Sequence, residues 1–449
     1  MGDKWVIVGG GINGIIAAYT LSAHGQKALL IEPEQHIGGV LRSVPWKGFF
    51  LDKGCHLFSN EKNEVTDIIL DILGDSYEPF TVRYASIYEK ELTHGFAIPN
   101  LEKLPENAKA KIFTELYFSD FEAPFSCENL FEQYRKRFGP TAAKIFESLT
   151  QKIFCCSAKS LGSEAINHTP FKRIKFLDDS RGEYAKQDAR IADLLAVSSQ
   201  SNPLRFYQNE SKKVGFRHFY PKGKGMATFC ELAHKKLVEL GVDIKCGIKV
   251  NAIEPHGVGA RLKLSDQTQL ETPKVYWAAG LEGLAKSLKL DVNSEEYIHR
   301  VPAIYHYFAI DEADSPDLTY AQNYDGDSTW YRMSCPGNYI NASACPPGKS
   351  YVCCEVPTKQ NSELWNMGKE GAPQVWRSLF ELGIVKNKTY LDSVTVKVPR
   401  TYAVPKRDFK HLAQKVEVEI GRLSENIIWN KDALFSKNEI IEEVLKNLS

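Results

Sequence analysis

A glycine-rich turn near the start of the chain restricts the possible folds more than any other feature. Residues 6–8 are apolar and predict a buried strand, which leads through Gly9, Gly11 and Gly14 into a predicted helix over residues 15–19. This is a G-x-G-x-x-G motif between a strand and a helix, the context that dinucleotide binding requires. The motif predicts an α/β fold of the Rossmann type. A purely structural glycine turn is the alternative interpretation.

Each residue of the motif has a chemical role in such a fold. Gly9 allows the tight turn, Gly11 lets a pyrophosphate approach the backbone, and Gly14 lets the helix lie close to the strand. Ile12 and Asn13 lie in the turn just before the predicted helix, whose N-terminus offers unpaired backbone N–H groups and a partial positive charge to phosphate. These five residues are therefore predicted to contact the pyrophosphate of a dinucleotide.

A second predicted strand, residues 28–31, ends in Glu32. The acidic residue of a dinucleotide-binding fold lies about 20 residues beyond the glycines and accepts hydrogen bonds from a ribose diol. A carboxylate at this place also repels a 2′-phosphate, so NADP is not expected. Small Ala18 suits a close helix–sheet contact, and Gly25 suits the end of the helix.

Two later segments resemble a family of flavoproteins. Gly38 and Gly39 follow Glu32, and residues 49–54 have the pattern Phe-x-x-Asp-x-Gly. On these motifs the chain resembles the superfamily of amine oxidases, protoporphyrinogen oxidase, phytoene desaturases and UDP-galactopyranose mutase. The resemblance implies FAD as the cofactor. It also implies an α/β fold in which a Rossmann-type FAD/NAD(P)-binding domain is interleaved with a mixed α+β substrate domain.

The resemblance also assigns FAD contacts to the residues around the glycine pair. Bare glycines let the backbone approach an extended FAD, where a side chain would clash. Val40 and Arg42 belong to the same predicted contact segment. The chain departs from the pattern at His36, where the superfamily often has an arginine.

Residues 54–58 resemble the Gly-Gly-His-x-Phe segment of the mutase branch, which lies against the flavin ring. Cys55 replaces the second glycine of that segment. The resemblance makes His56 a candidate for both FAD binding and catalysis. A packed, hydrogen-bonded loop histidine is the alternative interpretation of His56.

Composition is that of an ordinary globular enzyme. Of 449 residues, 43% are hydrophobic and 25% are charged, and 56 basic residues balance 56 acidic ones. Formal neutrality gives no support to nucleic-acid or anionic-membrane binding, and no apolar run approaches the ~20 residues of a membrane span. The first strand begins too early for a signal peptide, so a cytoplasmic location is expected. Ten cysteines without a C-x-x-C motif predict thiols rather than a metal site.

The predicted organisation is interleaved. Residues 1–75, 215–300 and 400–449 are predicted to form the FAD-binding domain, and residues 76–214 and 301–399 the substrate or cap domain. The first cap segment is predicted to be irregular and helical, with a helix from Leu130 to Phe138, a break at Gly139 and Pro140, and a second helix from Ala142. The second cap segment is rich in Tyr and Val and predicts sheet.

Three further residues of the FAD-binding portion follow from the resemblance. A strand over residues 248–253, which contains Val250, corresponds to the strand that contacts the adenosine half of FAD. A strand over residues 275–280 ends at Gly280 and resembles a second crossing beside the cofactor, although a plain exit from a strand also explains it. Lys222 is either a phosphate contact or a solvated loop lysine.

Two residues are candidate substrate contacts with His56. Arg332 lies in an aromatic–Arg segment that faces substrate in the mutase branch, where its guanidinium could hold a diphosphate by a bidentate fork. The alternative is a strand arginine with a local acidic partner. Tyr402 lies in a stretch that resembles the Tyr-Pro-x-Pro of the family. Arg173 either reaches the site from the cap or belongs to a basic helix face.

The resemblance weakens at the C-terminal end. Superfamily members usually place Gly-Arg-x-Gly or Gly-Asp before the final helix, but no glycine follows Gly421 here. The final helix is predicted from about Glu439. FAD is therefore held by other contacts, held loosely, or lost.

Three functions remain open at this point. The first is an FAD-dependent oxidoreductase that takes hydride from a small or sugar-linked substrate. The second is a mutase-like isomerase of nucleotide- or lipid-linked sugars, as in polysaccharide biosynthesis. The third is a non-catalytic binding protein with an FAD fold. A small molecule is the expected partner, and no heptad or large apolar helix face indicates an oligomer.

Overall fold

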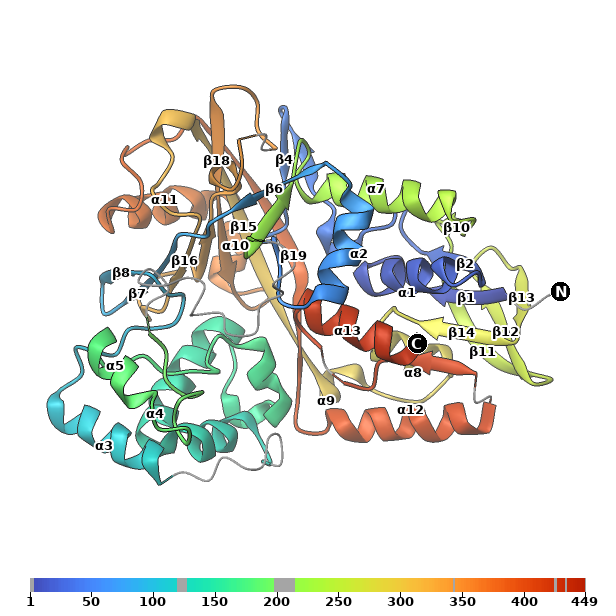
Figure 1. The fold of residues 1–449 in the computed structure, drawn as a ribbon, viewed down its shortest axis with the longest axis horizontal. Coiled ribbons are helices and arrows are strands. Elements are labelled where there is room, and N and C mark those ends of the chain that lie inside the picture. The colour runs from blue at the N-terminus through green and yellow to red at the C-terminus, as the bar shows by residue number, and fades with distance from the viewer. Residues whose placement is uncertain are drawn as a thin grey trace. The chain divides into compact units, whose positions relative to one another are not determined.

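The computed structural model describes residues 4–118, 127–197, 215–341, 344–423, 426–432 and 434–448, and the chain divides into two compact units (Figure 1). Unit 1 consists of Met1–Glu78, Ser211–Tyr297 and Asp408–Ser449, and unit 2 of Pro79–Glu210 and Ile298–Arg407. Each unit has its own main sheet and is described by itself.

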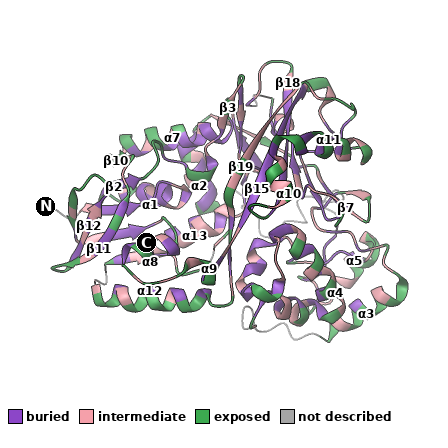
Figure 2. Cartoon of the chain, turned by 180° about the vertical axis from the view of Figure 1, so that it is seen from behind, coloured by how far each residue is buried: buried purple, intermediate pink, exposed green. Residues whose placement is uncertain are grey.

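Unit 1 is built on a parallel sheet of five strands in the order β10-β2-β1-β14-β20. Their bounds are β1 Lys4–Val8, β2 Lys27–Glu32, β10 Asp243–Cys246, β14 Lys274–Trp277 and β20 Ile427–Trp429. The central strands are runs of buried apolar residues (Figure 2), as expected for a parallel sheet covered on both faces. The predicted α/β Rossmann-type fold is therefore confirmed.

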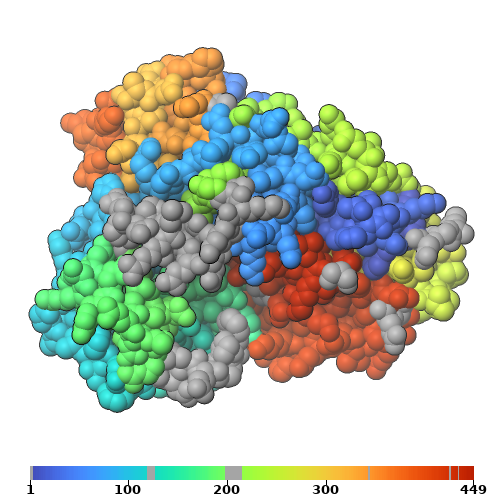
Figure 3. Space-filling view, viewed as in Figure 1, coloured from blue at the N-terminus to red at the C-terminus, as the bar shows by residue number. Residues whose placement is uncertain are grey.

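The helices of unit 1 pack against this sheet or against one another. Helix α1 (Ile12–Ala23) follows β1 and packs against the final helix, α13 (Lys437–Leu448), so C-terminal atoms adjoin N-terminal atoms on the surface in Figure 3. Helix α12 (Phe409–Leu423) buries Phe409, Leu412 and Val416 at helical spacing and exposes its other side (Figure 2).

The other elements of unit 1 form smaller sheets and connecting helices. A three-stranded antiparallel sheet contains β11–β13, a hairpin contains β3 and β4, and β5, β9 and β6 form a further small sheet. The bounds are η1 Gly39–Leu41, β3 Val44–Trp46, β4 Phe49–Leu51, β5 Phe58–Ser59, α2 Asn63–Leu73, β6 Tyr77–Phe80, β9 His218–Pro221, α7 Met226–Glu239, β11 Val250–His256, β12 Gly259–Leu264, β13 Gln269–Thr272, α8 Leu281–Ser287 and α9 Ser294–Tyr297.

Unit 2 contains a seven-stranded sheet in the order β19-β15-β18-β17-β16-β7-β8. The bounds are β7 Tyr84–Tyr88, β8 Glu91–His94, β15 Ile298–Asp311, β16 Tyr320–Asn323, β17 Arg332–Ser334, β18 Lys349–Pro357 and β19 Asp392–Pro405. One face is apolar and packs on α11 (Ala372–Glu381), where the rings of Phe308 and Trp376 lie 5.0 Å apart.

The predicted strands are present. The pair β7–β8 was not predicted, nor was the helical stretch from Glu363 to Glu381 inside the block predicted as sheet.

The helical part of unit 2 has its own aromatic core around Tyr134, Phe146 and Phe171. The break predicted at Gly139 is a kink in α4, where φ is +84° and a Cβ would lie 2.3 Å from the Cβ of Glu115. The bounds of the short and helical elements are α3 Glu106–Tyr117, α4 Leu130–Phe154, η2 Ala158–Ser160, η3 Ser163–His168, α5 Asp179–Ala185, η4 Glu312–Asp314, η5 Pro336–Asn338, α10 Glu363–Met367 and η6 Gly368–Gly371.

The basic helix face suggested for Arg173 is wrong. Residues 171–173 form a turn, and Ile174 and Lys175 are in bridge positions rather than in a helix. The amide of Ile174 donates to the carbonyl of Leu194 at 2.8 Å, and the amide of Ala196 donates to the carbonyl of Ile174 at 2.9 Å. These non-local hydrogen bonds replace those that a helix would need.

No helix within the described ranges combines the length and apolar composition that a membrane crossing requires. The same residues contain no group of three or more His, Cys, Asp or Glu side chains that could hold a metal ion.

Candidate functional site

Two glycines of the G-x-G-x-x-G turn are required by the fold of unit 1 itself. Gly9 has φ +105°, and a Cβ there would lie 3.0 Å from the backbone nitrogen of Ala279 on the neighbouring strand connection. A Cβ on Gly14 would lie 1.8 Å from the carbonyl oxygen of Gly9. No side chain fits at that distance, so Gly14 allows α1 to approach the end of β1.

Gly11 differs from these two glycines. Its φ of −71° and ψ of −177° are open to any residue, and a Cβ would meet no atom within 4 Å. It is the N-cap of α1, which has no side-chain cap hydrogen bond and no acidic residue in its first turn. The first amides of α1, including those of Ile12 and Asn13, therefore receive no hydrogen bond from a side chain of the N-cap residue and carry a partial positive charge. This arrangement fits the pyrophosphate of a dinucleotide.

Glu32 holds the glycine turn in place. One carboxylate oxygen accepts a hydrogen bond from the amide of Gly10 at 2.5 Å, and the other accepts from the amide of Glu34 at 2.9 Å. The side chain is buried at the end of β2. The sequence motif gave Glu32 a role toward the ligand but did not reveal its contact with Gly10, because that contact depends on how the turn folds back.

The glycine pair packs directly on this turn. The amide of Gly38 donates to the carbonyl of Gly10 at 2.7 Å, and a Cβ on Gly39 would lie 3.3 Å from the Cα of Gly11. Gly38 has φ +122°, and a Cβ there would lie 2.4 Å from the sulfur of Cys230 in α7. The pair therefore connects the turn to α7, as a close backbone approach without side chains requires.

Two side chains beside the glycine pair, Val40 and Arg42, are accessible to solvent. Val40 is 64% exposed. Arg42 is half-buried, and in the described part of the chain no hydrogen bond or ion pair joins its guanidinium to another residue. Both were predicted to contact FAD, and both lie on the segment that adjoins the glycine turn.

Asp52 is a site residue to which sequence reasoning gave no role. It is 1% exposed, and its carboxylate accepts hydrogen bonds from the hydroxyls of Ser43 and Tyr220 and from the amide of Met226 at the start of α7. Burial raises the pKa of Asp52 to about 6, against the lowering effect of these hydrogen bonds. The Phe-x-x-Asp-x-Gly pattern was the available signal. Its aspartate joins residues 49–54 to α7.

The other predicted residues of unit 1 lie in separate loops and strands. His56 is partly buried in the connection between β4 and β5. Val250 is buried at the first position of β11, opposite Leu264. Gly280 is the N-cap of α8 with φ +82°, and nothing lies within 4 Å of a Cβ placed on it.

Lys222 has a contact that neither interpretation anticipated. Its ammonium donates to the carbonyl of Asp75 at 3.0 Å, and its amide donates to the carbonyl of Ser76 at 3.0 Å. Lys222 thus joins the loop before α7 to the segment after α2.

The C-terminal segment contacts the dinucleotide motif through a tyrosine. The hydroxyl of Tyr276 lies 3.0 Å from Oδ1 of Asn13 and 3.3 Å from Oδ1 of Asn430, which also accepts from Asn447 at 3.2 Å. Helix α13 then begins with a capping box. The amide of Glu439 donates to the hydroxyl of Ser436 at 3.1 Å, and the amide of Ser436 donates to the carboxylate of Glu439 at 3.2 Å.

The two candidate substrate residues of unit 2 contact each other. Arg332 in β17 forms a bidentate ion pair with Glu355 in β18, with Nε–Oε1 at 2.5 Å and Nη2–Oε2 at 2.6 Å. The hydroxyl of Tyr402 donates to Glu355 at 2.7 Å and accepts from Nη2 of Arg332 at 3.1 Å. Arg332 therefore has the local acidic partner of its second interpretation, and Glu355, 1% exposed, was not singled out from the sequence.

Of the three predicted catalytic residues, the structure brings Arg332 and Tyr402 together in unit 2. His56 lies in unit 1. Glu355 faces Arg332 in the register of β17 and β18, which a sequence without known strand pairing does not reveal.

Comparisons with known proteins agree with this fold. A family model described as flavin containing amine oxidoreductase matches residues 12–309. A mitochondrial protoporphyrinogen oxidase of Nicotiana tabacum is 37% identical over 68 residues, which are 15% of this chain, and the chain spans only 13% of that relative's length.

Two solved structures share the fold over nearly the full chain. A reduced UDP-galactopyranose mutase has a TM-score of 0.70 at 16% identity, covering 99% of this chain and 96% of its own. A putrescine oxidase bound to putrescine has a TM-score of 0.64 at 13% identity, covering 100% of this chain and 98% of its own. At these identities the similarity concerns the fold alone.

Proposed function

Because the chain belongs to the family of flavin-containing amine oxidoreductases, we propose that it is an FAD-dependent oxidoreductase that takes hydride from a C–H bond next to nitrogen or oxygen in a small or sugar-linked substrate. When bound, FAD supplies the two-electron chemistry, and the protein supplies binding, orientation and exclusion of water. The observation that carries this proposal is the start of α1, where uncapped amides and Gly11 leave space for a pyrophosphate.

In this proposal unit 1 holds the pyrophosphate on Gly9, Gly11, Ile12, Asn13 and Gly14. Glu32 holds the ribose. Each carboxylate oxygen of Glu32 already accepts one backbone hydrogen bond, and each retains a lone pair for a ribose hydroxyl. The remaining residues of the proposed FAD site are Gly38, Gly39, Val40, Arg42, His56, Val250 and Gly280.

Arg332 and Tyr402 are the proposed substrate contacts in unit 2. His56, in unit 1, stays a proposed flavin contact and catalytic residue. The Nε and Nη2 atoms of Arg332 are taken by Glu355, and Nη2 also donates to Tyr402. This leaves Nη1 and the hydroxyl of Tyr402 for a substrate. A neutral or weakly charged polar group suits such a pair better than a diphosphate, which would need a free fork.

That geometry ranks the oxidoreductase above a mutase-like isomerase of nucleotide- or lipid-linked sugars. The isomerase remains the second candidate because Arg332 and Tyr402 lie together, as a shared sugar site requires. A non-catalytic binding protein ranks third. It rests on the C-terminal segment alone, where α13 is capped by its own side chains.

The first test is the visible absorption spectrum of the purified protein, before and after addition of FAD and then dithionite. We expect two flavin bands that bleach on reduction. Screens of amines, alcohols and nucleotide sugars with the oxidised and reduced forms then separate oxidoreductase from isomerase. A colourless protein that takes up no FAD would favour the binding-protein alternative.

The matched variants are Gly11→Val and Gly421→Val. Both glycines lie in unit 1 and have open space around a Cβ, but Gly421 lies in α12 away from the turn. Since neither substitution clashes within the protein, both variants should fold. We expect Gly11→Val to weaken FAD binding more than about 100-fold, because a blocked pyrophosphate loses its charge-assisted hydrogen bonds. Full FAD occupancy in Gly11→Val would show that the site is elsewhere.

A further inference from the structure

A group of three cations in unit 2 goes beyond the proposed oxidoreductase. We propose that Arg137, Arg173 and Lys186 form a binding site for an anionic group, a phosphate or a carboxylate, of a small-molecule ligand. The three residues come from α4, from the turn at residues 171–173 and from the residue after α5. All three side chains are partly buried and partly exposed.

Backbone pairing brings two segments of this site together. Ile174 bridges Leu195 in parallel, with hydrogen bonds from Ile174 to Leu194 at 2.8 Å and from Ala196 to Ile174 at 2.9 Å. Arg173 therefore stands at the start of a paired segment, beside residues 192–196. Its position is fixed by non-local hydrogen bonds and not by a flexible loop.

Hydrogen bonds hold the other two cations next to the same two segments, residues 192–196 and the turn at residues 171–173. The ammonium of Lys186 donates to the carbonyls of Ala192 at 2.6 Å and Leu195 at 3.0 Å. Arg137 donates through Nε and Nη2 to the carbonyl of Lys172 at 3.2 and 2.9 Å. Lys186 thus contacts residues 192–195, which lie beside Arg173. Arg137 contacts Lys172, the residue before Arg173 in the chain.

The charges of these three residues are not neutralised locally. Within the described ranges, no carboxylate lies within ion-pair distance of Arg137, Arg173 or Lys186. Asp193 acts on Arg137 and Lys186, and Glu183 acts on Lys186, only at longer range. Burial and the charge of Arg173 lower the pKa of both residues, which is the direction expected when like charges gather.

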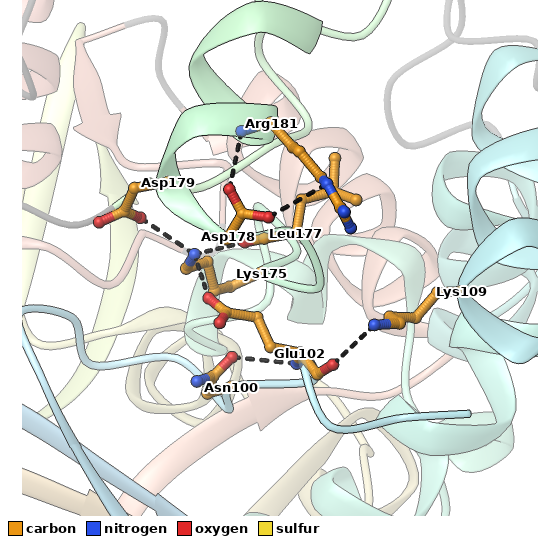
Figure 4. A network of polar contacts seen from close by, with 8 residues as sticks. All are labelled: Asn100, Glu102, Lys109, Lys175, Leu177, Asp178, Asp179 and Arg181. Atoms are coloured by element: carbon orange, nitrogen blue, oxygen red, sulfur yellow. Dashed lines mark hydrogen bonds and ion pairs between the residues drawn. The ribbon is translucent and has the colours of Figure 1, made fainter. Parts of the chain in front are cut away.

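Lys175, two residues after Arg173, is a buried cation whose charge is paired within the protein (Figure 4). Its side chain is 1% exposed, and its ammonium forms ion pairs with Glu102 and with Asp179 at 3.0 Å and donates to the carbonyl of Leu177. A buried cation needs such partners. Arg173 has none among the described residues, so its charge is left for a ligand, while Lys175 fixes the segment that carries it.

Phosphate and carboxylate share the chemistry that this site recognises. The planar guanidinium groups can donate paired hydrogen bonds to two oxygens of either anion, and Lys186 adds a point charge. Because the two described carboxylates that act on these cations, Asp193 and Glu183, lie beyond ion-pair distance, a group with more than one negative charge suits the site best.

The test is calorimetric titration of the full chain at low salt, in the Gly11→Val background so that α1 does not contribute. Inorganic pyrophosphate and citrate are the two probes, and the tighter one identifies the anion class. We expect Arg173→Gln to raise the Kd about tenfold or more, the loss expected for a charge-assisted hydrogen bond. The matched control is Arg181→Gln, whose guanidinium pairs with Asp178, and it should leave the Kd within about twofold.

Asp193→Asn gives an opposite and independent prediction. Removing the carboxylate that acts on both Arg137 and Lys186 should lower the Kd about two- to fivefold, as for a weakly screened surface charge. If Arg173→Gln does not fold, the variant Arg173→Lys replaces it. Arg173→Lys keeps the charge but loses the planar fork, so its Kd should be higher than that of the parent by less than the tenfold expected for loss of the charge. Equal effects of Arg173→Gln and Arg181→Gln, weaker binding in Asp193→Asn, or no binding of either probe would overturn the proposal. The FAD spectrum is measured separately, so a failure of the FAD site leaves this result readable.

Discussion

Helices α1 and α13 each come next in the chain after a strand of the parallel sheet in unit 1, yet their first turns are completed in opposite ways. Helix α1 follows β1 and has neither a capping side chain nor an acidic residue in its first turn. Helix α13 follows β20 and has the capping box of Ser436 and Glu439. Every helix start leaves backbone N–H groups to be satisfied. Where the chain does not satisfy them, as in α1, an anionic ligand can.

Helix α7 is an intermediate case. Its first amides receive acceptors from another segment, since the amide of Met226 donates to Asp52 at 3.3 Å and that of Ala227 donates to Ser43 at 3.0 Å. The starts of α1, α13 and α7 are thus left open, capped from within, and capped from a neighbouring segment, respectively. The comparison indicates that α1 alone among these three offers an anion site.

The largest effect should come from the glycine that lets α1 approach β1. Gly14→Ala puts a Cβ 1.8 Å from the carbonyl oxygen of Gly9, so the backbone must shift. We expect the free energy of unfolding to fall by more than about 3 kcal/mol, the upper range of overpacking effects. Chemical denaturation measures it. Gly11→Ala is the matched control and should stay within about 0.5 kcal/mol. Similar losses in both variants would contradict the distinction drawn between the two glycines.

A middle-sized effect is expected at the start of α7. The pKa of Asp52 is raised to about 6 in the folded state. A folded pKa above the unfolded value means that the native state binds the proton more tightly, so Asp52 favours folding at low pH and loses this contribution as the pH rises through about 6. Between pH 7 and 4, the stability of the parent chain relative to Asp52→Asn should therefore rise by about 2 kcal/mol.

Urea unfolding of both proteins across this pH range gives the difference directly, and other carboxylates cancel in it. A relative stability that is flat or falls toward pH 4 would show that Asp52 is not protonated in this range.

The smallest effects should come from exchanging the two kinds of helix start. Ser436→Ala removes the cap of α13 and should cost about 1 kcal/mol of stability without changing the FAD Kd. Gly11→Ser supplies a capping hydroxyl to α1, which should leave stability unchanged or raise it by a few tenths of a kcal/mol while weakening FAD binding. Thermal unfolding and fluorescence titration with FAD measure the two quantities. A Gly11→Ser variant with unchanged FAD affinity would contradict the role given to the open start of α1.

The segment from β1 to β2 could be predicted from the sequence because its signals are local. Apolar runs, the spacing of Gly9, Gly11 and Gly14, and the position of Glu32 all act within about one βαβ unit. The kink in α4 was predicted for the same reason, since Gly139 and Pro140 act on their own backbone.

The contacts that were missed join residues far apart in the chain. Asp52 contacts Tyr220 and Met226, and Glu355 reaches Tyr402, so their roles depend on how the elements pack. Arg173 was given a basic helix face as its alternative, but its neighbour Ile174 bridges Leu195, a residue about 20 positions away that the local sequence does not indicate as a partner. Short strands such as β7 and β8 carry too few residues for a clear alternation.

The order of strands in unit 1 has a consequence for synthesis of the chain on the ribosome. Strand β20 pairs with β14 at one edge of the sheet, although more than 100 residues separate them in the sequence. Until residues 427–429 emerge, β14 is an edge strand whose unpaired N–H and C=O groups can pair with another chain. We therefore expect the nascent protein to be more prone to aggregation until residues 427–429 pair with β14, unless a chaperone covers this edge.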